Sequence, residues 1–495
     1  MTAPSLISHD AAVVKAELLR MFSSLLDPLL ESARAGKLTP RAAELGTWSL
    51  VIPLGAAVLT ALFAALARGS AKRAVDRLGA DVVGVRWRMD ADYWGTVRTT
   101  FGSVTFPWFA FRRGGTTQVP ARELFPLHPD VRSSEVLLEW ESLLAADHPF
   151  RKAQEALRFF CHGAADIEDN TIERHAVLVG KAIPPRWLYR KTEDLRSILR
   201  DRAVRDTKTG LPIVHVSTDA HALRLFQDET WKAGWKMVNA VRIWCKDRET
   251  DETLHLGGEF MTGDYREVVR RLRELDRDKV LPFDGDYGDG LRAVVCVVTD
   301  GLDWIADHVV PLYPNALVSL DPYHVVEQVA DAAHKSFRKG RAKQVIRDAR
   351  RALGVRDRRS RTYYRKGPRR RFHRVRRSGL TGSGRRLLTK VLEPLAPEVK
   401  RGKKRFNRLL SFVRRNLPRL DYGDLRRRGA QIGSGAMESL HRTGSQVRLK
   451  RAGCRWTPAV AQAILHLRML ALSGRWNEYW DQPDLAAQVA AGGVT

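Results

Sequence analysis

The sequence predicts an α/β protein with a mixed β-sheet at its centre. Two unbroken apolar runs, Ile213–Asp219 and Ala293–Asp300, have the length and composition of strands buried on both faces of a sheet. Each run ends in an aspartate. Helical and strand-like segments alternate further along, as in sheets that are covered by helices. Two strands that each deliver a carboxylate at their carboxyl end place both charges in the crevice where open α/β sheets bind ligands.

The overall composition favours a polyanionic partner. The chain has 495 residues, of which 44% are hydrophobic, so two to four domains with ordinary cores are expected. Its formal net charge is +28, and arginine greatly outnumbers lysine. Because guanidinium groups bind phosphate oxygens in a bidentate manner, this excess favours nucleic acid over a membrane surface.

The cysteines point to a reducing compartment. Cys161, Cys245, Cys296 and Cys454 are scattered without the CxxC spacing of zinc sites and without the density of a disulfide framework. We interpret them as reduced thiols. No basic segment followed by an apolar one comes after Met1, so no secretory signal is expected and the predicted location is the cytoplasm.

One segment near the N-terminus has the composition of a membrane span. Residues 45–67 contain no charged side chain and are numerous enough to cross a bilayer. The segment is, however, rich in Ala and Gly, contains Pro53 and has no second segment of its kind. We therefore favour a buried or oligomer-forming helix in a helical N-terminal region, with a membrane span as the alternative.

The region before the sheet predicts a small β unit followed by helices. Val97–Phe106 alternates in polarity, which indicates antiparallel strands. Farther on, Arg151–Cys161 and Thr171–Lys181 have helical patterns, with Asn170 as the expected N-cap of the second helix. The two helices form a candidate helix-turn-helix in which Thr171, Arg174 and His175 would face a DNA groove. An ordinary helical bundle is the alternative.

The order of the central elements predicts an RNase H-like core. Three strands in a meander, followed by alternating helices and strands, are typical of that fold, in which the first and fourth strands are neighbours. Asp219 and Asp300 would then meet, and a divalent cation would relieve their mutual repulsion. Asp303 is a rival ligand or a helix cap. The expected elements are Ile213–Asp219, Met237–Lys246, Thr253–Met261, Tyr265–Leu275, Ala293–Asp300, Leu302–Leu312, Ala316–Asp321 and Tyr323–Phe337.

A basic insertion follows the last of these elements. Residues 335–377 contain twenty Lys and Arg residues against only Asp348 and Asp357. Aromatic side chains are interleaved with the basic ones, and the segment lies inside the chain rather than at an end. We interpret it as a nucleic-acid contact, with a merely solvated face as the alternative. The triplet Arg369, Arg370 and Arg371 is its most basic part.

A third carboxylate comes after the insertion. Gly433 and Gly435 form a flexible turn around Ser434, which is able to cap the helix that follows, and Glu438 falls in the first turn of that helix. Taken alone, this pattern is also that of an ordinary capped surface helix whose dipole favours an acidic residue.

Together these segments resemble a DDE transposase of a bacterial insertion sequence, closest to the ISKra/ISLre-type groups and more distantly similar to Mutator-like enzymes. The resemblance spans roughly residues 210–480 in the correct order. The segments that carry it are Ser217-Thr218-Asp219, Val298-Thr299-Asp300-Gly301 with Trp304-Ile305, Leu320-Asp321-Pro322-Tyr323-His324, Gly433-Ser434-Gly435-Ala436-Met437-Glu438-Ser439, and the basic Arg448-Leu449-Lys450-Arg451-Ala452-Gly453-Cys454-Arg455-Trp456.

The resemblance implies an RNase H-like core in which Asp219, Asp300 and Glu438 are catalytic and bind two Mg²⁺ or Mn²⁺ ions. It implies that His324 steadies the site or the scissile phosphate; a buried, packed histidine is the alternative. It also implies a homodimer or higher oligomer that acts on double-stranded DNA in the bacterial nucleoid. One departure is the lack of the Cys-rich zinc element found before the β unit in related proteins. Candidate DNA-binding residues are Arg174, Arg369, Arg370, Arg371, Arg448, Lys450, Arg451, Arg455 and Trp456.

The expected function is therefore metal-dependent DNA cleavage and strand transfer at the ends of an insertion sequence. An RNase H-like structure-specific endonuclease and a domesticated, non-catalytic DNA-binding protein are the alternatives. The expected organisation is a helical N-terminal or oligomerisation region at 1–85, a small β unit at 86–134, a helical region at 135–205, the first part of the core at 206–337, the basic helical insertion at 338–428, the rest of the core with the Glu438 helix at 429–482, and a tail at 483–495.

Overall fold

The computed structural model divides the chain into two compact units. Unit one comprises Met1–Pro184, Gln462–Ala471 and Arg475–Thr495, and unit two comprises Pro185–Ala461 and Leu472–Gly474. The residues that the structure describes are 4–77, 86–88, 94–113, 116–124, 131–226, 233–355, 382–451, 454–482, 485 and 489.

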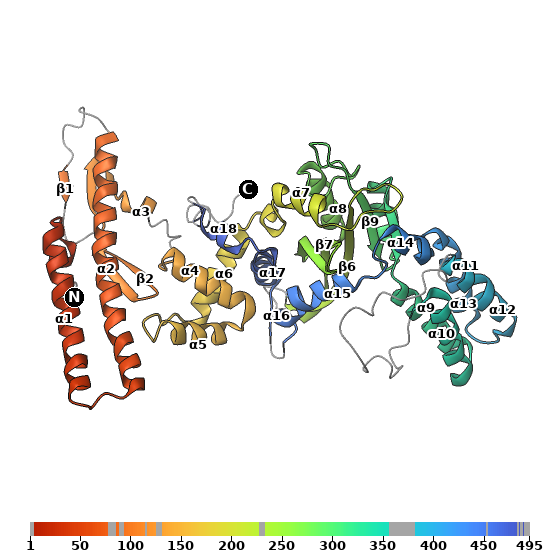
Figure 1. Ribbon diagram of the computed structural model, residues 1–495, viewed down its shortest axis with the longest axis horizontal. Helices are drawn as coiled ribbons and strands as arrows, with labels where there is room; N and C mark the ends of the chain where they lie inside the picture. Colours follow the sequence, from red (N-terminus) through yellow and green to blue (C-terminus); the bar gives the residue numbers. More distant parts are fainter. Residues whose placement is uncertain are drawn as a thin grey trace. The chain divides into compact units, whose positions relative to one another are not determined.

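Unit one begins with a long helical hairpin (Figure 1). After η1 (Pro4–Ile7), helix α1 spans Ala11–Arg34 and α2 spans Pro40–Arg77. The uncharged 45–67 segment is thus the middle of α2. In the described part of the chain α2 alone is long and apolar enough to cross a bilayer. Only 28% of its most apolar stretch of 18 residues is buried. Its buried alanines, among them Ala64, Ala67 and Ala71, pack against a small β unit.

That β unit contains two small sheets. Strands β2 (Trp94–Thr99) and β3 (Gly102–Pro107) form the antiparallel pair expected from the alternation of Val97–Phe106. Val97, Val104 and Phe106 are buried against α2. The second sheet has the order β1-β4-β5 and consists of β1 (Arg86–Arg88), β4 (Ala110–Arg113) and β5 (Thr116–Gln118), followed by α3 (Ala121–Leu124).

Three further helices complete the first 184 residues: α4 (Glu135–Asp147), α5 (Phe150–Phe160) and α6 (Asp169–Ala182). Two expectations about them are wrong. The N-cap of α6 is Glu168 rather than Asn170, which lies one residue inside the helix. His175 does not face a groove, because its ring is buried and its Nδ1 lies 2.5 Å from Glu141 Oε2 on α4.

Unit two contains a five-stranded mixed sheet with the order β10-β9-β6-β7-β8. Strands β6, β7 and β8 are antiparallel neighbours, whereas β9 runs parallel to both β6 and β10. The first and fourth strands of the sheet are therefore adjacent, as the element order predicts. The bounds are β6 (Ile213–Phe226), β7 (Ala233–Lys246), β8 (Thr253–Met261), β9 (Val294–Thr299) and β10 (Leu317–Leu320).

The first strand is longer than its apolar run. Asp219 was expected at the carboxyl end of a strand, but β6 continues for seven residues to Phe226. The extension pairs with β7 alone, since the pairing of β6 with β9 ends at Ser217 and Val298. A strand that has a neighbour on one side only need not be apolar on both faces. The apolar run in the sequence therefore ends where the pairing with β9 ends, and it does not reveal the rest of β6.

Helices surround this sheet and form the insertion. Before and within the core lie η3 (Pro185–Leu188), α7 (Thr192–Asp201), α8 (Tyr265–Arg277), the π-helical η4 (Ile305–Val309), η5 (Val310–Leu312) and α9 (Pro322–Ser336). In the insertion lie α10 (Lys339–Leu353), α11 (Ser383–Leu387), η9 (Leu388–Leu392), α12 (Glu393–Leu395), η10 (Ala396–Glu398), α13 (Lys403–Arg415), η11 (Leu417–Leu420) and α14 (Tyr422–Arg428). After it come α15 (Gly435–Leu440), η12 (His441–Gln446), α16 (Val447–Leu449), α17 (Pro458–Ser473) and α18 (Trp476–Trp480).

One apolar core joins the sheet to the insertion. It contains sheet residues such as Ile213, Cys296 and Val298 together with Val329 of α9 and Phe406 of α13. Because residues two apart on a strand share a face, the face that carries Ile213 also carries Asp219. The insertion helices α10 and α13, which lie beside α9 in Figure 1, therefore share an apolar core with the sheet face on which Asp219 lies.

The cysteines are free thiols. Cys161, Cys245 and Cys296 are buried, whereas Cys454 is partly exposed. Burial raises the pKa of Cys161, and it raises the pKa values of Cys245 and Cys296 to about 12.

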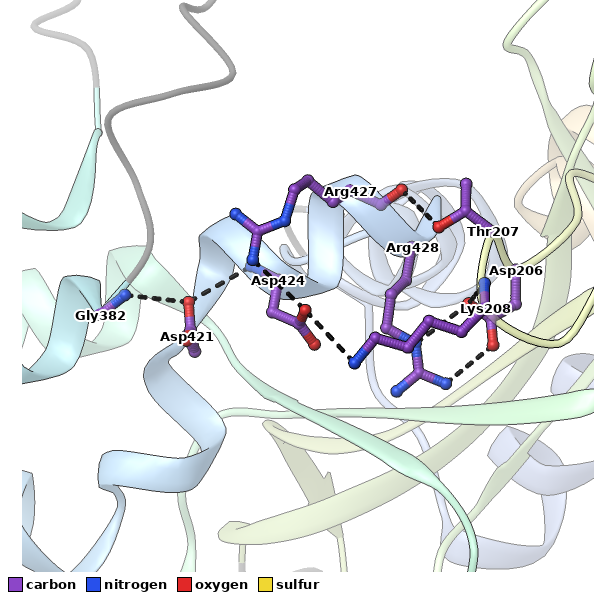
Figure 2. Close-up of polar contacts among 8 residues, drawn as sticks. All are labelled: Asp206, Thr207, Lys208, Gly382, Asp421, Asp424, Arg427 and Arg428. Carbon is purple, nitrogen blue, oxygen red and sulfur yellow. Dashed lines mark hydrogen bonds and ion pairs between the residues drawn. The ribbon is translucent and has the colours of Figure 1, made fainter.

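An ionic clasp holds the end of the insertion against the segment that leads into β6. Figure 2 shows Arg428, the last residue of α14, bound to Asp206 through both carboxylate oxygens, at 2.7 and 3.0 Å. Nearby, Lys208 Nζ lies 3.6 Å from Asp424 Oδ1. Asp421 caps α14 and accepts the backbone N–H of Gly382, where the described part of the insertion resumes.

Folding lowers the pKa of the aspartate in this clasp. Asp206 is fully buried, and the Arg428 hydrogen bonds lower its pKa from 3.8 to about 2. An acid whose pKa is depressed on folding stabilises the fold above its unfolded pKa, and this stabilisation is lost as the pH falls through the folded value. The relevant window is thus from about pH 4 down to about pH 2.

We predict that Asp206→Asn lowers the free energy of unfolding by about 2–3 kcal/mol at pH 7. The variant loses the ionised carboxylate that the folded state stabilises, and it leaves Arg428 without its charged partner. The difference from wild type should shrink by about 1 kcal/mol at pH 3. Urea unfolding followed by circular dichroism at both pH values measures it. A difference that stays constant between pH 7 and pH 3 would contradict the assigned pKa.

Candidate active site

Two carboxylates lie just beyond the paired stretch of two neighbouring parallel strands. The β6–β9 register ends at the pair Ser217 and Val298, two residues before Asp219 and Asp300. The two side chains are near enough for the negative charge of Asp219 to raise the pKa of Asp300. Asp300 follows the last residue of β9, and its Oδ1 accepts the N–H of Leu302 at 3.0 Å. Both carboxylates are partly buried.

The pKa values of the two aspartates are shifted in opposite directions. Burial raises the pKa of Asp300, and the negative charge of Asp219 raises it further. Burial also acts to raise the pKa of Asp219, but the hydrogen bond and charge of His441 outweigh it, so the pKa of Asp219 is lowered. The charge of His324 lowers the pKa of both. The site therefore combines two coupled acids with two nearby imidazoles.

The direct partner of Asp219 is a histidine that the sequence did not single out. His441 Nε2 lies 3.1 Å from Asp219 Oδ2, and the ring is only 4% exposed. It packs edge-on against His221 and beside Phe260, with ring centroids at 4.6 and 5.7 Å. His221 is in turn bonded to Ser445 at 2.9 Å. Burial lowers the pKa of His221 to about 3, so this ring is neutral at physiological pH.

Glu438 lies one helical turn before His441. It is in the first turn of α15, as predicted, and its side chain is exposed. Residues three apart on a helix lie on the same side, so Glu438 and His441 belong to one face. Within the described part of the chain, however, no three His, Cys, Asp or Glu side chains are close enough together to hold a metal ion. The described structure therefore does not bring Asp219, Asp300 and Glu438 together as a closed ligand set.

A chain segment, residues 431–445, is fastened across the sheet face that carries Asp219. Alternate residues of β6 and β10 hold it, as do two residues of β7. The contacts are His215 Nε2 with the N–H of Gln431 (2.9 Å), Trp244 Nε1 with Gln431 Oε1 (3.0 Å), Ser319 Oγ with the Ile432 carbonyl (2.9 Å), Asp321 with the N–H of Ser434 (2.5 Å), Arg242 with the Ala436 carbonyl, Asp219 with His441, and His221 with Ser445.

Asp321 connects this segment to the helix that carries His324. The carboxylate is fully buried. Its Oδ1 accepts the backbone N–H groups of Tyr323 and His324 at 2.6 and 3.3 Å, which caps α9. Its Oδ2 accepts the N–H of Ser434, the N-cap of α15. Ser434 itself makes no side-chain cap, contrary to expectation, and its backbone N–H is instead donated to Asp321, the residue after β10.

The remaining predicted residues near the site have different surroundings. His324 is 37% exposed rather than packed in the core, and its Nδ1 lies 3.4 Å from Glu327 on the same helix. Asp303, the rival ligand, is exposed and pairs with Arg415 of α13 at 3.4 Å. Of the two, His324 is thus the residue whose charge acts on both candidate acids.

The predicted DNA-binding residues after Glu438 divide into two groups. Lys450, Arg451 and Arg455 are exposed. Arg448 and Trp456 are buried and face each other, with the guanidinium 4.6 Å from the ring centre. Arg448 and Trp456 are thus internal rather than at the surface, because a basic, Trp-containing pattern cannot distinguish a surface from an internal cation–π pair.

Two other groups of predicted DNA-binding residues lie elsewhere. Arg174 is exposed on α6 in unit one. Arg369, Arg370 and Arg371 fall outside the described residues.

The side chains at the site are of the type that binds a hard divalent cation, although three of them are not close enough together to hold one in the described structure. Carboxylate oxygens are the ligands that Mg²⁺ and Mn²⁺ prefer, and Asp219 and Asp300 provide them from adjacent strands. The negative charge of Asp219 is one cause of the raised pKa of Asp300, so the two carboxylates repel each other. A bound cation would relieve this repulsion.

No protein-family model matches the chain, and a search of curated proteins gives no match. Among solved structures, a Drosophila P element transposase strand transfer complex is similar at 12% sequence identity and a TM-score of 0.23, over 72% of this chain and 83% of that chain. Values this low assign neither a fold nor a function.

We predict that Asp321→Asn lowers the free energy of unfolding by about 1.5–3 kcal/mol, because an amide cannot accept both helix N-termini as a carboxylate does. Urea denaturation measures the change. The matched control is Asp303→Asn, which alters an exposed carboxylate near the same site and should change stability by less than about 0.5 kcal/mol. Equal stability of both variants would show that Asp321 does not fasten the segment.

Proposed function

We propose that the chain is a DDE transposase with an RNase H-like core, which cleaves DNA at the ends of a bacterial insertion sequence and transfers the strand. The observation that carries the proposal is that Asp219 and Asp300 each lie two residues beyond the last paired residues of the parallel strands β6 and β9, where the negative charge of Asp219 raises the pKa of Asp300. The strand order β10-β9-β6-β7-β8 supports the RNase H-like assignment. The resemblance to ISKra/ISLre-type enzymes supplies the reaction.

In this proposal Asp219, Asp300 and Glu438 hold two Mg²⁺ or Mn²⁺ ions. When bound, such a pair of ions activates the attacking water or 3′-hydroxyl and stabilises the leaving oxygen at phosphorus. Asp219 is kept ionised by His441, which suits a metal ligand. His324 is placed to steady a phosphate beside the two acids, and Asp321 positions the helices of both His324 and Glu438.

The basic surfaces supply the partner. Exposed Lys450, Arg451 and Arg455 follow the Glu438 helix directly, where they would hold phosphates next to the reacting bond. The excess of 84 Lys and Arg over 56 Asp and Glu favours double-stranded DNA as the polyanion. Because two element ends must be held together for transposition, we propose that the active form is a homodimer or larger.

We predict that Asp219→Asn, Asp300→Asn and Glu438→Gln each reduce Mg²⁺-dependent nicking of duplex DNA by about 10³-fold or more, while DNA affinity changes little. Gel analysis of nicked plasmid and fluorescence anisotropy measure the two quantities. Asp303→Asn is the control and should nick normally. Wild-type nicking by any of the three variants would remove that residue from the catalytic set.

The substrate separates the transposase from its rivals. Linear DNA ending in terminal inverted repeats should be cleaved at the repeat ends in preference to branched DNA of equal length. A preference for the branched substrate would indicate a structure-specific endonuclease instead, and binding without any nicking would indicate a non-catalytic DNA-binding protein.

We predict that His441→Phe raises the Mg²⁺ concentration needed for half-maximal nicking and lowers the rate by about 10–100-fold, as loss of a group that orients a metal ligand does. His441→Gln, which keeps a donor near Asp219, should recover part of both. Metal titrations of the nicking rate measure them. If the Phe and Gln variants lose stability and rate equally, the histidine fills space rather than orienting Asp219.

A further inference from the structure

A groove of about 500 Å³ lies in unit two and is lined by residues that the proposed mechanism does not use. One wall is helix α8, and the other includes His308 in the segment that follows Asp300. Four arginines of α8 line it, against one glutamate, Glu274. The arginines are Arg266, Arg270, Arg273 and Arg277.

The arginines form one face of an amphipathic helix. The opposite face of α8 is buried through Val268, Leu272 and Leu275, together with Arg271, which pairs with buried Glu259 at 2.7 Å. The groove arginines have the spacing i, i+4, i+7 and i+11, so they lie in a row. At a rise of 1.5 Å per residue the row is roughly 16 Å long, which matches a few consecutive phosphates of a DNA strand.

Most of these guanidinium groups are available to an incoming anion. Arg270 is held between Glu267 and Glu274, at 2.7 and 2.5 Å. Arg266 and Arg277 are each within 3.8–4.0 Å of one exposed aspartate only, and ion pairs of this kind contribute little in water. Arg273 has no carboxylate within ion-pair distance in the described part of the chain. A phosphate that is bound in a bidentate manner can therefore displace the existing contacts.

Aromatic rings close one end of the groove. Tyr265, the first residue of α8, stacks on His308 with ring centroids 5.0 Å apart and an interplanar angle of 15°. Trp304 lies beside Tyr265 at 5.6 Å. Trp304 follows Asp300 by only four residues, so the groove starts next to the loop of a candidate catalytic acid. Rows of guanidinium groups are common in surfaces that contact phosphates of nucleic acids, and the rings mark where this row ends.

We propose that this groove binds the phosphodiester backbone of a DNA duplex as it extends away from the active site. The inference rests on the proposed function in so far as the partner is DNA. The groove would be a second contact, separate from Lys450, Arg451 and Arg455. It would determine the length of duplex beyond the cleaved bond that the protein contacts, without taking part in the chemistry.

The test uses the full-length double variant R273A/R277A and the matched control R200A/R248A, which removes two exposed arginines outside the groove. The affinity for a fluorescent 40-base-pair duplex is measured by anisotropy between 50 and 300 mM NaCl. Each phosphate contact contributes about 0.9 to the slope of log affinity against log salt. The groove variant should lose about 1.8 from this slope, and the control should match wild type.

The outcomes separate this inference from the proposed function. Equal slopes for the groove variant, the control and wild type would overturn the inference, even if nicking by the wild type supports the transposase assignment. A salt dependence for R273A/R277A that is less steep than that of wild type, with Mg²⁺-dependent nicking of a short duplex retained, supports the inference. A lower slope in a protein that does not nick at all also supports the DNA contact, while the catalytic proposal fails alone.

Discussion

A single buried carboxylate, that of Asp321, determines where the rest of the candidate site lies. It accepts hydrogen bonds from the first turn of α9 through one oxygen and from the N-cap of α15 through the other. A charge in this position is stabilised by two helix dipoles and three N–H groups, which offset the cost of burying it. Two segments more than a hundred residues apart are thereby fixed to one strand end.

Segment 431–445 and the insertion are both held against the sheet near Asp321. Segment 431–445 lies across the sheet because side chains from the three strands β6, β7 and β10 contact it at intervals. The insertion leaves β10 through α9 and returns through α14, where the Asp206–Arg428 clasp holds it. The insertion thus shares an apolar core with the sheet and is held to it at both ends.

Much of the fold follows from the sequence, and the exceptions have physical causes. The buried parallel strands β9 and β10 are apolar except for Thr299 and Ser319, so their patterns predict their bounds to within about one residue. The second half of β6 has only an antiparallel neighbour and was missed. Asp219 and Asp300 were predicted as neighbours from element order. His441 was not, since one histidine in a polar helix gives no signal, although its spacing of three from Glu438 places both on one face. Arg448 and Trp456 were assigned to the surface because burial of an arginine over a tryptophan depends on tertiary packing.

The burial of three of the four cysteines has a practical consequence. Thiol reagents attack the thiolate, and the raised pKa values of Cys161, Cys245 and Cys296 leave almost none of it at neutral pH. Cys454 is partly exposed and lies between Arg451 and Arg455. A maleimide dye therefore attaches first at a native position inside the basic segment, where its emission reports on an approaching polyanion without any engineered residue.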